Sequence, residues 1–163
     1  MPDSNIPSLH CALPAGCLLH VKTFSQLSTG ELYELLRIRS EVFVVEQNCV
    51  YQDLDCNDQT AIHIWLARGE KVLAMCRVCP GGTKMEGTSI GRVITTERGK
   101  GYGMLIMKAA IGIVRERFPH VGHIDIEAQF TKLGFYERLG FVATSEPFMM
   151  EGLMHIGMRL DLQ

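Results

Sequence analysis

The stretch Arg98-Gly99-Lys100-Gly101-Tyr102-Gly103 decides the fold assignment of this chain. It follows a strand-like run over residues 89–95 and opens a helix-like run that extends to about Phe118. The glycines predict a turn whose backbone N–H groups lie bare at the start of a helix. Such a turn suits a phosphate group, because the N–H groups and the positive end of the helix dipole both face the anion. Arg98 and Lys100 add positive charge beside it, so we expect a phosphorylated ligand.

The spacing of the glycines separates the known phosphate-binding motifs. A Walker loop needs GxxxxGK followed by Ser or Thr, and a dinucleotide fingerprint needs GxGxxG; here Met104 stands where the third glycine of that fingerprint belongs. The pattern Arg-x-x-Gly-x-Gly does fit, as Arg98, Gly101 and Gly103. It resembles the coenzyme A pyrophosphate loop of the GNAT N-acetyltransferases. A tight connection between a strand and a helix would use the same glycines, so a second motif is needed.

A second segment supplies that motif. Ala128-Gln129 precedes Phe135-Tyr136-Glu137-Arg138-Leu139-Gly140-Phe141, which is similar to the other GNAT signature and follows the glycine loop in the family's order. The neighbouring aromatic and aliphatic residues can be core, and Gly140 can end a helix, so only Tyr136 needs another reason. Many GNATs carry Asn where this chain has Gln129, and either side chain can bond an amide of the cofactor.

Further segments extend the resemblance to the ElaA-type branch of the GNAT family, namely residues 39–49, 51–55, 90–93 and 155–158. We therefore expect an N-terminal extension over residues 1–17 and a single N-acetyltransferase domain over residues 18–163. The resemblance implies an α/β fold. Its central sheet would be mixed and mostly antiparallel, with helices on both faces and a splayed central strand pair.

The resemblance also implies the cosubstrate and the chemistry. Acetyl-CoA would lie with its pantetheine arm along one splayed strand and its pyrophosphate on the glycine turn. A primary amine, on a small molecule or a peptide, would attack the acetyl group directly in a ternary complex. A backbone N–H near Val93 or Ile94 would stabilise the oxyanion, and Tyr136 would protonate the leaving thiolate. The expected contacts with acetyl-CoA are those of Val93, Ile94, Thr95, Arg98, Gly99, Lys100, Gly101, Tyr102, Gly103, Met104, Gln129 and Tyr136.

The base that takes the proton of the amine is left open. The candidates, acting directly or through water, are Glu46, Glu127, His63 and His155. We place Glu46 first, because GNAT acceptors enter beside the first long helix and the loop that follows it. In that loop Asp53, Asp55 and Asp58 would present an acidic surface suited to a cationic amine, although a solvated loop is the plainer explanation.

Composition limits the class of protein. The chain has 163 residues, of which 47% are hydrophobic and 21% charged, as in one globular domain. A net charge of -2 argues against nucleic-acid binding, and the sequence lacks an apolar run long enough to span a membrane. No basic residue precedes Lys22, unlike in a secretion signal, so we expect a cytoplasmic protein. Exposed sheet edges in such a fold can pair two chains into a homodimer.

The six cysteines include one CxxC, Cys76-Arg77-Val78-Cys79. It lies in an expected strand, where positions three apart face opposite sides, and no second CxxC accompanies it. We therefore expect no metal site, and we expect the cysteines to be reduced fillers of the core.

The remaining elements follow from periodicity and from turn and capping residues. Ser28 and Glu31 have capping-box spacing and predict a helix start, and Pro119 predicts the end of the helix that opens at the glycine turn. We expect strands over residues 18–24, 62–67, 71–78, 89–95 and 123–128, a short helix over 132–139, and last strands beginning at Phe141 and His155.

Three functions other than N-acetylation would use parts of the same sequence pattern. A domain that senses acyl-CoA without turnover would use the same glycine turn, but it has no need of the acid Tyr136. A small kinase would need the Walker Ser or Thr and a pair of Mg²⁺-binding carboxylates, which the sequence lacks. An enzyme with a different acyl group is a third alternative, decided by the width of the pocket near Met75, Met104 and Phe130.

Overall fold

The computed structural model describes residues 12–163, so most of the expected extension over residues 1–17 lies outside the described residues. The strands are β1 (Cys17–Thr23), β2 (Ile62–Arg68), β3 (Lys71–Cys79), β4 (Ser89–Thr95), β5 (His123–Gln129), β6 (Val142–Ala143), β7 (Phe148–Met150) and β8 (Leu153–Asp161). The helices are η1 (Phe24–Gln26), α1 (Thr29–Arg39), η2 (Ser40–Glu46), η3 (Asp58–Thr60), α2 (Tyr102–Arg117), η4 (Phe130–Lys132) and α3 (Leu133–Glu137).

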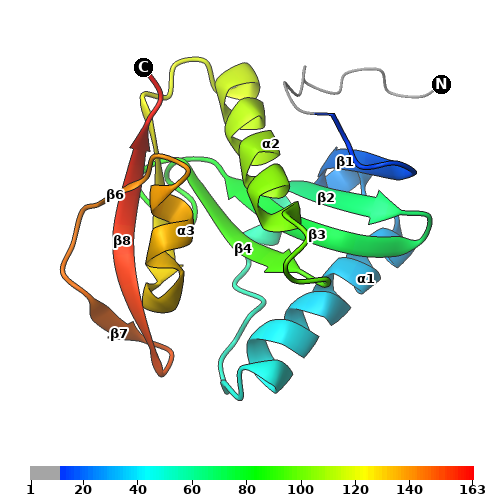
Figure 1. Ribbon diagram of the computed structural model, residues 1–163, viewed down its shortest axis with the longest axis horizontal. Helices are drawn as coiled ribbons and strands as arrows, with labels where there is room; N and C mark the ends of the chain where they lie inside the picture. Colours follow the sequence, from blue (N-terminus) through cyan, green and yellow to red (C-terminus); the bar gives the residue numbers. More distant parts are fainter. Residues whose placement is uncertain (1–11) are drawn as a thin grey trace.

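The strands form one sheet in the order β1-β2-β3-β4-β5-β8-β6, with β7 paired to β8. Every pairing is antiparallel except that of β4 with β5. Figure 1 shows α2 lying across β2, β3 and β4, with α3 beside β8 and α1 beyond the opposite side of the sheet. The expected fold, a mixed and mostly antiparallel sheet with helices on both faces, is confirmed.

Alternation along β2 explains the two layers. Ile64 and Leu66 belong to the core under α2, whereas Trp65 and Ala67 pack with α1 on the other face. All four are buried, since strands in the middle of a sheet covered on both faces have no solvent side. The middle of the sheet, including β3 and β4, is therefore held between two helical layers.

The start of α1 is fixed by the predicted capping box. The Glu31 N–H donates to Ser28 Oγ at 3.1 Å, and the Ser28 N–H donates to the Glu31 carboxylate at 2.9 Å. Past Arg39 the helix continues as the wider π-type turns of η2. Such turns often mark functional sites, and here they bring the following loop back toward β4.

Two predictions about the C-terminal strands were incomplete. The strand expected from Phe141 has only two residues, in β6, and the last strand begins at Leu153, before His155. Between them β7 was missed, because its three residues are too few to show a period. A two-residue turn, Glu151-Gly152, joins β7 to β8.

A bulge in β4 separates the two halves of the sheet. Gly91 pairs with Arg77 and Ile94 pairs with Met75, so that Arg92 and Val93 stand opposite a single residue of β3. Arg92 has a φ of 55°, in the left-handed region that non-glycine residues rarely adopt. Beyond the bulge β4 bends away from β5. In the part of the chain that the structure describes, the two strands pair at a single position, Ser89 with Asp125.

A buried ion-pair network supports this bulge from the loop after η2. Arg39 is 2% exposed. Its Nε lies 2.9 Å from Asp53 Oδ2, and its Nη1 lies 2.6 Å from Asp58 Oδ1. The network therefore ties the end of α1 to two points of the loop.

The strands supply the other arginines of the network. Arg77 of β3 donates to Asp55 Oδ1 at 2.8 Å and to Asp58 Oδ1 at 2.9 Å. Arg92 of the bulge donates to the Asp53 carbonyl at 2.8 Å, and its Nε lies 2.7 Å from Asp53 Oδ1. The expectation that these aspartates offer an acidic or solvated loop was wrong, because three arginines from elsewhere in the chain pair with them.

We predict that Asp58→Asn lowers the free energy of unfolding by about 3–5 kcal/mol, because it leaves buried guanidinium groups without a full partner. The matched control is Glu34→Gln, which removes a carboxylate from the exposed pair with Arg37 and should cost less than about 1 kcal/mol. Urea unfolding followed by circular dichroism measures both. Equal losses in the two variants would contradict the prediction.

The stability of Asp58→Asn at low pH provides a second measurement on the same variant. Burial alone would raise the pKa of Asp58, but the hydrogen bonds from Arg39 and Arg77 and their charges lower it overall. A depressed carboxyl pKa stabilises the fold above the pKa of the unfolded chain, and that stability is lost as the pH falls. Below about pH 4, Asp58→Asn should therefore lose less stability than the wild type.

Candidate active site

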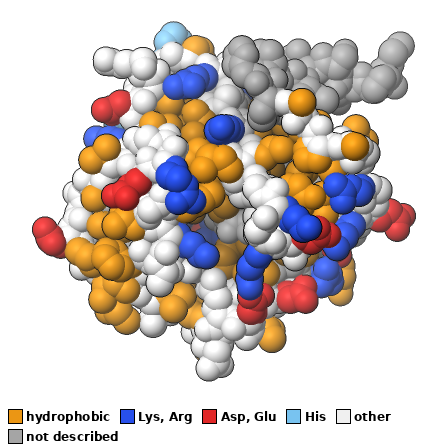
Figure 2. All heavy atoms as spheres, viewed as in Figure 1, with side chains coloured by type: hydrophobic (Ala, Val, Ile, Leu, Met, Phe, Trp, Pro, Cys, Tyr) orange, Lys and Arg blue, Asp and Glu red, His pale blue; other side chains and the backbone are white. Residues whose placement is uncertain are grey.

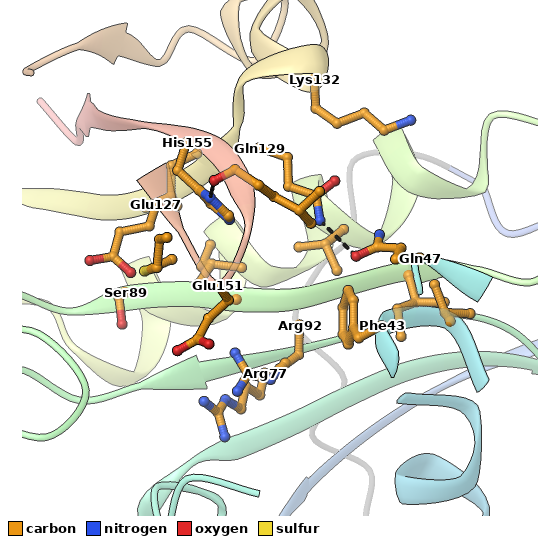
Figure 3. Close-up of a pocket in the computed structure, with 18 of the residues that line it drawn as sticks. Phe43, Gln47, Arg77, Ser89, Arg92, Glu127, Gln129, Lys132, Glu151 and His155 are labelled. Carbon is orange, nitrogen blue, oxygen red and sulfur yellow. Dashed lines mark hydrogen bonds between the residues drawn. The ribbon is translucent and has the colours of Figure 1, made fainter. Parts of the chain in front are cut away.

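A cavity of about 380 Å³ opens where β4 and β5 part (Figure 3). The apolar part of its lining includes Val42, Phe43, Ile90, Val93, Ile94, Ile126, Met150 and Leu153. The polar and charged part includes Gln47, Tyr51, Arg77, Lys84, Ser89, Arg92, Thr95, Arg98, Glu127, Gln129, Lys132, Tyr136, Glu151 and His155. Of the sequence-predicted contacts, the cavity thus collects Val93, Ile94, Thr95, Arg98, Gln129 and Tyr136.

The glycine turn lies between β4 and α2, as the sequence predicted. Gly99 and Gly101 have φ values of 75° and 79°, which favour glycine. Gly101 precedes the first residue of α2, and no side chain caps that helix. The first N–H groups of a helix lack partners within it, so those of Tyr102, Gly103 and Met104 are available to an anion.

The side chains of the turn differ in what they can contact. Tyr102 is buried, and its hydroxyl accepts a hydrogen bond from Arg68 at 3.4 Å, so only its backbone N–H can serve a ligand. Lys100 is exposed. Figure 2 shows Lys and Arg side chains gathered on the face that carries α2 and α3. Positive charge on this face suits a phosphorylated ligand.

Arg98 forms an ion pair with Glu46 at the end of η2. Both side chains border a second hollow beside the turn, and Arg98 also lines the main cavity. Glu46, expected as the base, is not part of the main lining. Its carboxylate instead neutralises the arginine that the motif assigns to phosphate.

Tyr136 projects from α3 among aromatic rings. Phe135 and Phe141 meet its ring edge-on, with centroid distances of 5.0 Å and 6.0 Å. Burial raises the pKa of the Tyr136 hydroxyl to about 12, and the hydroxyl has no hydrogen-bond partner among the residues described. Tyr136 therefore keeps its proton at neutral pH and can donate it into the cavity.

Gln129 contacts the opposite wall. Its side-chain amide donates to Gln47 Oε1 at 3.1 Å, which bridges the end of β5 to the residue after η2 (Figure 3). A ligand that uses the Gln129 amide must share it with this bridge or replace Gln47.

The four candidates for the base lie in different parts of the structure, and two of them line the main cavity. Glu127 of β5 and His155 of β8 line the cavity. His63 does not: it is buried beside the Phe24 ring, its Nε2 lies 2.9 Å from the Asp58 carbonyl oxygen, and burial lowers its pKa. The structure thus brings only Glu127 and His155 of the four candidates into the main cavity.

Sequence reasoning missed four residues that shape this cavity: Phe43, Arg77, Arg92 and Glu151. Arg92 lies 6.0 Å from the centre of the Phe43 ring, a cation–π contact. Only Glu151 had a local signal beside it, since the glycine that follows, Gly152, favours a turn. The others depend on partners far away along the chain.

Both cysteines of the CxxC are buried in β3, and burial raises the pKa of each thiol. Residues 12–163 hold no group of three or more His, Cys, Asp or Glu side chains arranged for a metal ion. Over the same residues, no helix combines the length and apolar character needed to cross a membrane.

Comparison with known proteins identifies the family. A model of the acetyltransferase (GNAT) domain matches residues 29–162. The chain belongs to the GNAT family. ElaA of Escherichia coli is 36% identical to this GNAT protein over 142 residues, which cover 85% of this chain and 92% of ElaA.

Solved structures agree with this assignment. The crystal structure of E. coli ElaA matches with a TM-score of 0.82 and 34% identity, covering 88% of this chain and 99% of that chain. An acyl-CoA N-acyltransferase from Pseudomonas aeruginosa matches with a TM-score of 0.81 and 32% identity, covering 88% and 99%. The resemblance to the ElaA-type branch is confirmed, and with it an acyl-CoA-dependent N-acyltransferase family whose members act on amines.

We predict that Glu46→Gln strengthens the binding of acetyl-CoA, because it frees Arg98 from an internal competitor. An exposed ion pair of this kind is worth up to about 1 kcal/mol, so the dissociation constant should fall by up to about fivefold. Calorimetric titration measures it, with Glu41→Gln as the control, since Glu41 is an exposed glutamate that pairs with Arg37 instead of Arg98. Turnover in Glu46→Gln that falls a hundredfold while binding is kept would instead restore Glu46 as the base.

Proposed function

We propose that this protein transfers an acetyl group from acetyl-CoA to a primary amine by direct attack in a ternary complex. The observation that carries the proposal is one continuous cavity. It runs from Arg98 beside the glycine turn, along the free edge of β4, to Tyr136. Arg98 beside the glycine turn, a β4 edge that β5 leaves free past Ser89 and an acid without a hydrogen-bond partner among the described residues match the parts that an acyl-CoA requires.

The proposed cosubstrate site uses backbone more than side chains. Bare N–H groups at the start of α2 would hold the pyrophosphate, with Arg98 and Lys100 adding charge. The β4 edge at Val93, Ile94 and Thr95 would pair with the amides of the pantetheine arm, as an added strand does. A side chain at Gly101 would meet no other atom within 4 Å, so that position is open to a ligand.

Acetyl-CoA supplies an activated acyl group; the protein would supply position and proton transfer. Holding the amine against the thioester can account for up to about 7–11 kcal/mol of the barrier. A backbone N–H of the bulge near Val93 or Ile94 would donate to the carbonyl oxygen. As the new C–N bond forms and the C–S bond breaks, Tyr136 would give its proton to sulfur, and a cavity base would take the proton of the amine.

The placement of the base candidates favours Glu127 or His155, directly or through water. Both line the cavity, whereas Glu46 pairs with Arg98 and His63 is buried behind the loop. We therefore assign the base to the β5–β8 wall. This replaces the preference for Glu46 that the sequence suggested.

The acyl group of the cosubstrate would lie against the apolar part of the cavity. Val42, Phe43 and Ile94 form its apolar part near β4. Met75, Met104 and Phe130, expected to set the acyl-chain length, are not part of the lining. A longer acyl group is the alternative, and a comparison of acetyl-CoA with octanoyl-CoA as donors distinguishes the two.

The first test is calorimetric titration of acetyl-CoA into the wild type, Gly101→Ala and Gly101→Glu. Both variants carry the same backbone strain, because the φ of Gly101 is 79°, but only the second places a carboxylate where the pyrophosphate would lie. We expect Gly101→Glu to bind at least about 100-fold more weakly than Gly101→Ala, or about 2.7 kcal/mol. Absence of binding by the wild type would overturn the proposal.

A second test concerns the acid. Tyr136→Phe keeps the ring contacts and removes only the hydroxyl, so acetyl-CoA binding and thermal stability should stay unchanged. Turnover should fall by about 10²–10⁴-fold. Tyr51→Phe removes another hydroxyl from the same cavity, one that is bonded to Asp53 at 3.1 Å, and should retain turnover.

The pH dependence adds a constraint on that acid. Because burial raises the pKa of Tyr136 to about 12, the donor stays protonated and its ionisation causes no loss of turnover below about pH 11. A loss of turnover near neutral pH in the wild type that is absent from Tyr136→Phe would contradict this role.

The alternative, a sensor domain without turnover, would bind acetyl-CoA and release no CoA with any amine.

A further inference from the structure

The arginines of the cavity are already paired, whereas its two lysines, Lys84 and Lys132, form no ion pair among the residues described. Arg77 and Arg92 bind the aspartates of the buried network, and Arg98 binds Glu46. Lys132 is directed away from Glu127 in Figure 3. Lys84 is exposed on the loop between β3 and β4 and lies within 4 Å of no carboxylate among the residues described.

The carboxylates of the cavity show the opposite pattern. Glu127 and Glu151 both line it, and both are labelled in Figure 3. Neither carboxylate has an ion-pair or hydrogen-bond partner in the described part of the chain. All three aspartates of the neighbouring loop, by contrast, are bonded to arginine. Both residues are exposed, so their carboxylates are free to exchange water for a cationic ligand that enters the cavity.

The backbone at Glu151 supports a role for this side chain. Glu151 and Gly152 form the two-residue turn between β7 and β8, with φ values of 50° and 76°. Such a turn favours Asn-Gly or Asp-Gly, and glutamate there carries strain, which often marks a functional position. The thiol of Cys49 donates to the Glu151 carbonyl and fixes the turn against the loop after η2.

A third group, His155, lines the cavity and has one ring nitrogen without a partner among the described residues. His155 is only 7% exposed. Its Nδ1 lies 2.8 Å from the Leu153 carbonyl oxygen, which can only accept, so Nδ1 carries the hydrogen. The Phe148 ring stacks on the imidazole at a centroid distance of 6.2 Å. Nε2 is therefore left as an oriented acceptor, with no partner among residues 12–163.

From these groups we infer that the acceptor is a small primary amine with a second positive charge, an aliphatic diamine or polyamine. Glu127 and Glu151 hold its distal ammonium group, and His155 Nε2 takes the proton from the attacking nitrogen. The nitrogen bonds to the acetyl carbon, and the C–S electron pair stays on sulfur, which is protonated by Tyr136. The inference rests on the proposed function and specifies its acceptor.

The test compares three series of amines of matched length with acetyl-CoA as donor. They are the diamines from diaminopropane to diaminohexane, the corresponding monoamines, and the corresponding ω-amino acids, which carry a carboxylate at the distal end. Release of CoA is measured for each. We expect the best diamine to exceed its monoamine by about tenfold or more in kcat/KM, since hydrogen bonds to a charged group are among the strongest, and the amino acid to be poorest.

Variants locate the effect. Glu127→Gln and Glu151→Gln should each lower kcat/KM for the diamine about tenfold more than they lower kcat/KM for the monoamine. Glu151→Asn should do the same without loss of stability, because Asn accepts the left-handed conformation of the turn. Glu116→Gln, on the exposed side of α2, is the matched control and should keep the preference.

The outcomes separate this inference from the proposed function. If the wild type binds acetyl-CoA but acetylates no diamine, or prefers the monoamine or the amino acid, the acceptor class is overturned and the acetyltransferase proposal stands. A diamine preference unchanged in Glu127→Gln and Glu151→Gln also overturns it. If the wild type does not bind acetyl-CoA, the proposed function fails and the inference fails with it.

Discussion

The buried pairing of three arginines with three aspartates is the constraint on which the active-site wall depends. Arg39 comes from the end of α1, Arg77 from β3 and Arg92 from the bulge of β4, so the network joins parts of the chain that no local force brings together. Burying such charges is costly unless each is paired and hydrogen bonded. Every guanidinium group of the network has a carboxylate partner, although the Nε atoms of Arg77 and Arg92 donate no hydrogen bond among the described residues. The network fixes the loop after η2 and holds the bulge in its left-handed conformation.

The cavity follows from that bulge. A regular β4 would continue to pair with β5 and close the sheet, whereas the extra residue turns the strand away after Ser89. The separation exposes backbone of β4 to one side and brings β5, β8 and α3 to the other. One local irregularity thus provides both the strand edge for a cosubstrate and the space for an acceptor.

Local motifs were predictable from the sequence, and distant pairings were not. The glycine turn, the capping box at Ser28 and the short helix carrying Tyr136 are each encoded within a few residues, and the structure contains all three. The partners of Asp53, Glu46 and Gln129 are 14, 52 and 82 residues away. No spacing rule reaches that far, so the loop aspartates were taken for a surface and Glu46 for a base.

The contact between Glu46 and Arg98 has a consequence for the reaction cycle. An attached carboxylate competes for the arginine at an effective concentration that dilution does not change. This competition weakens the binding of every ligand that brings a phosphate to the turn, substrate and product alike, because Glu46 pairs with Arg98 whether or not the ligand carries an acyl group. Because the competition weakens the binding of the ground state and of the transition state equally, it raises KM without slowing the chemical step. It also shortens the time for which the product CoA stays bound. The carboxylate therefore favours exchange over retention.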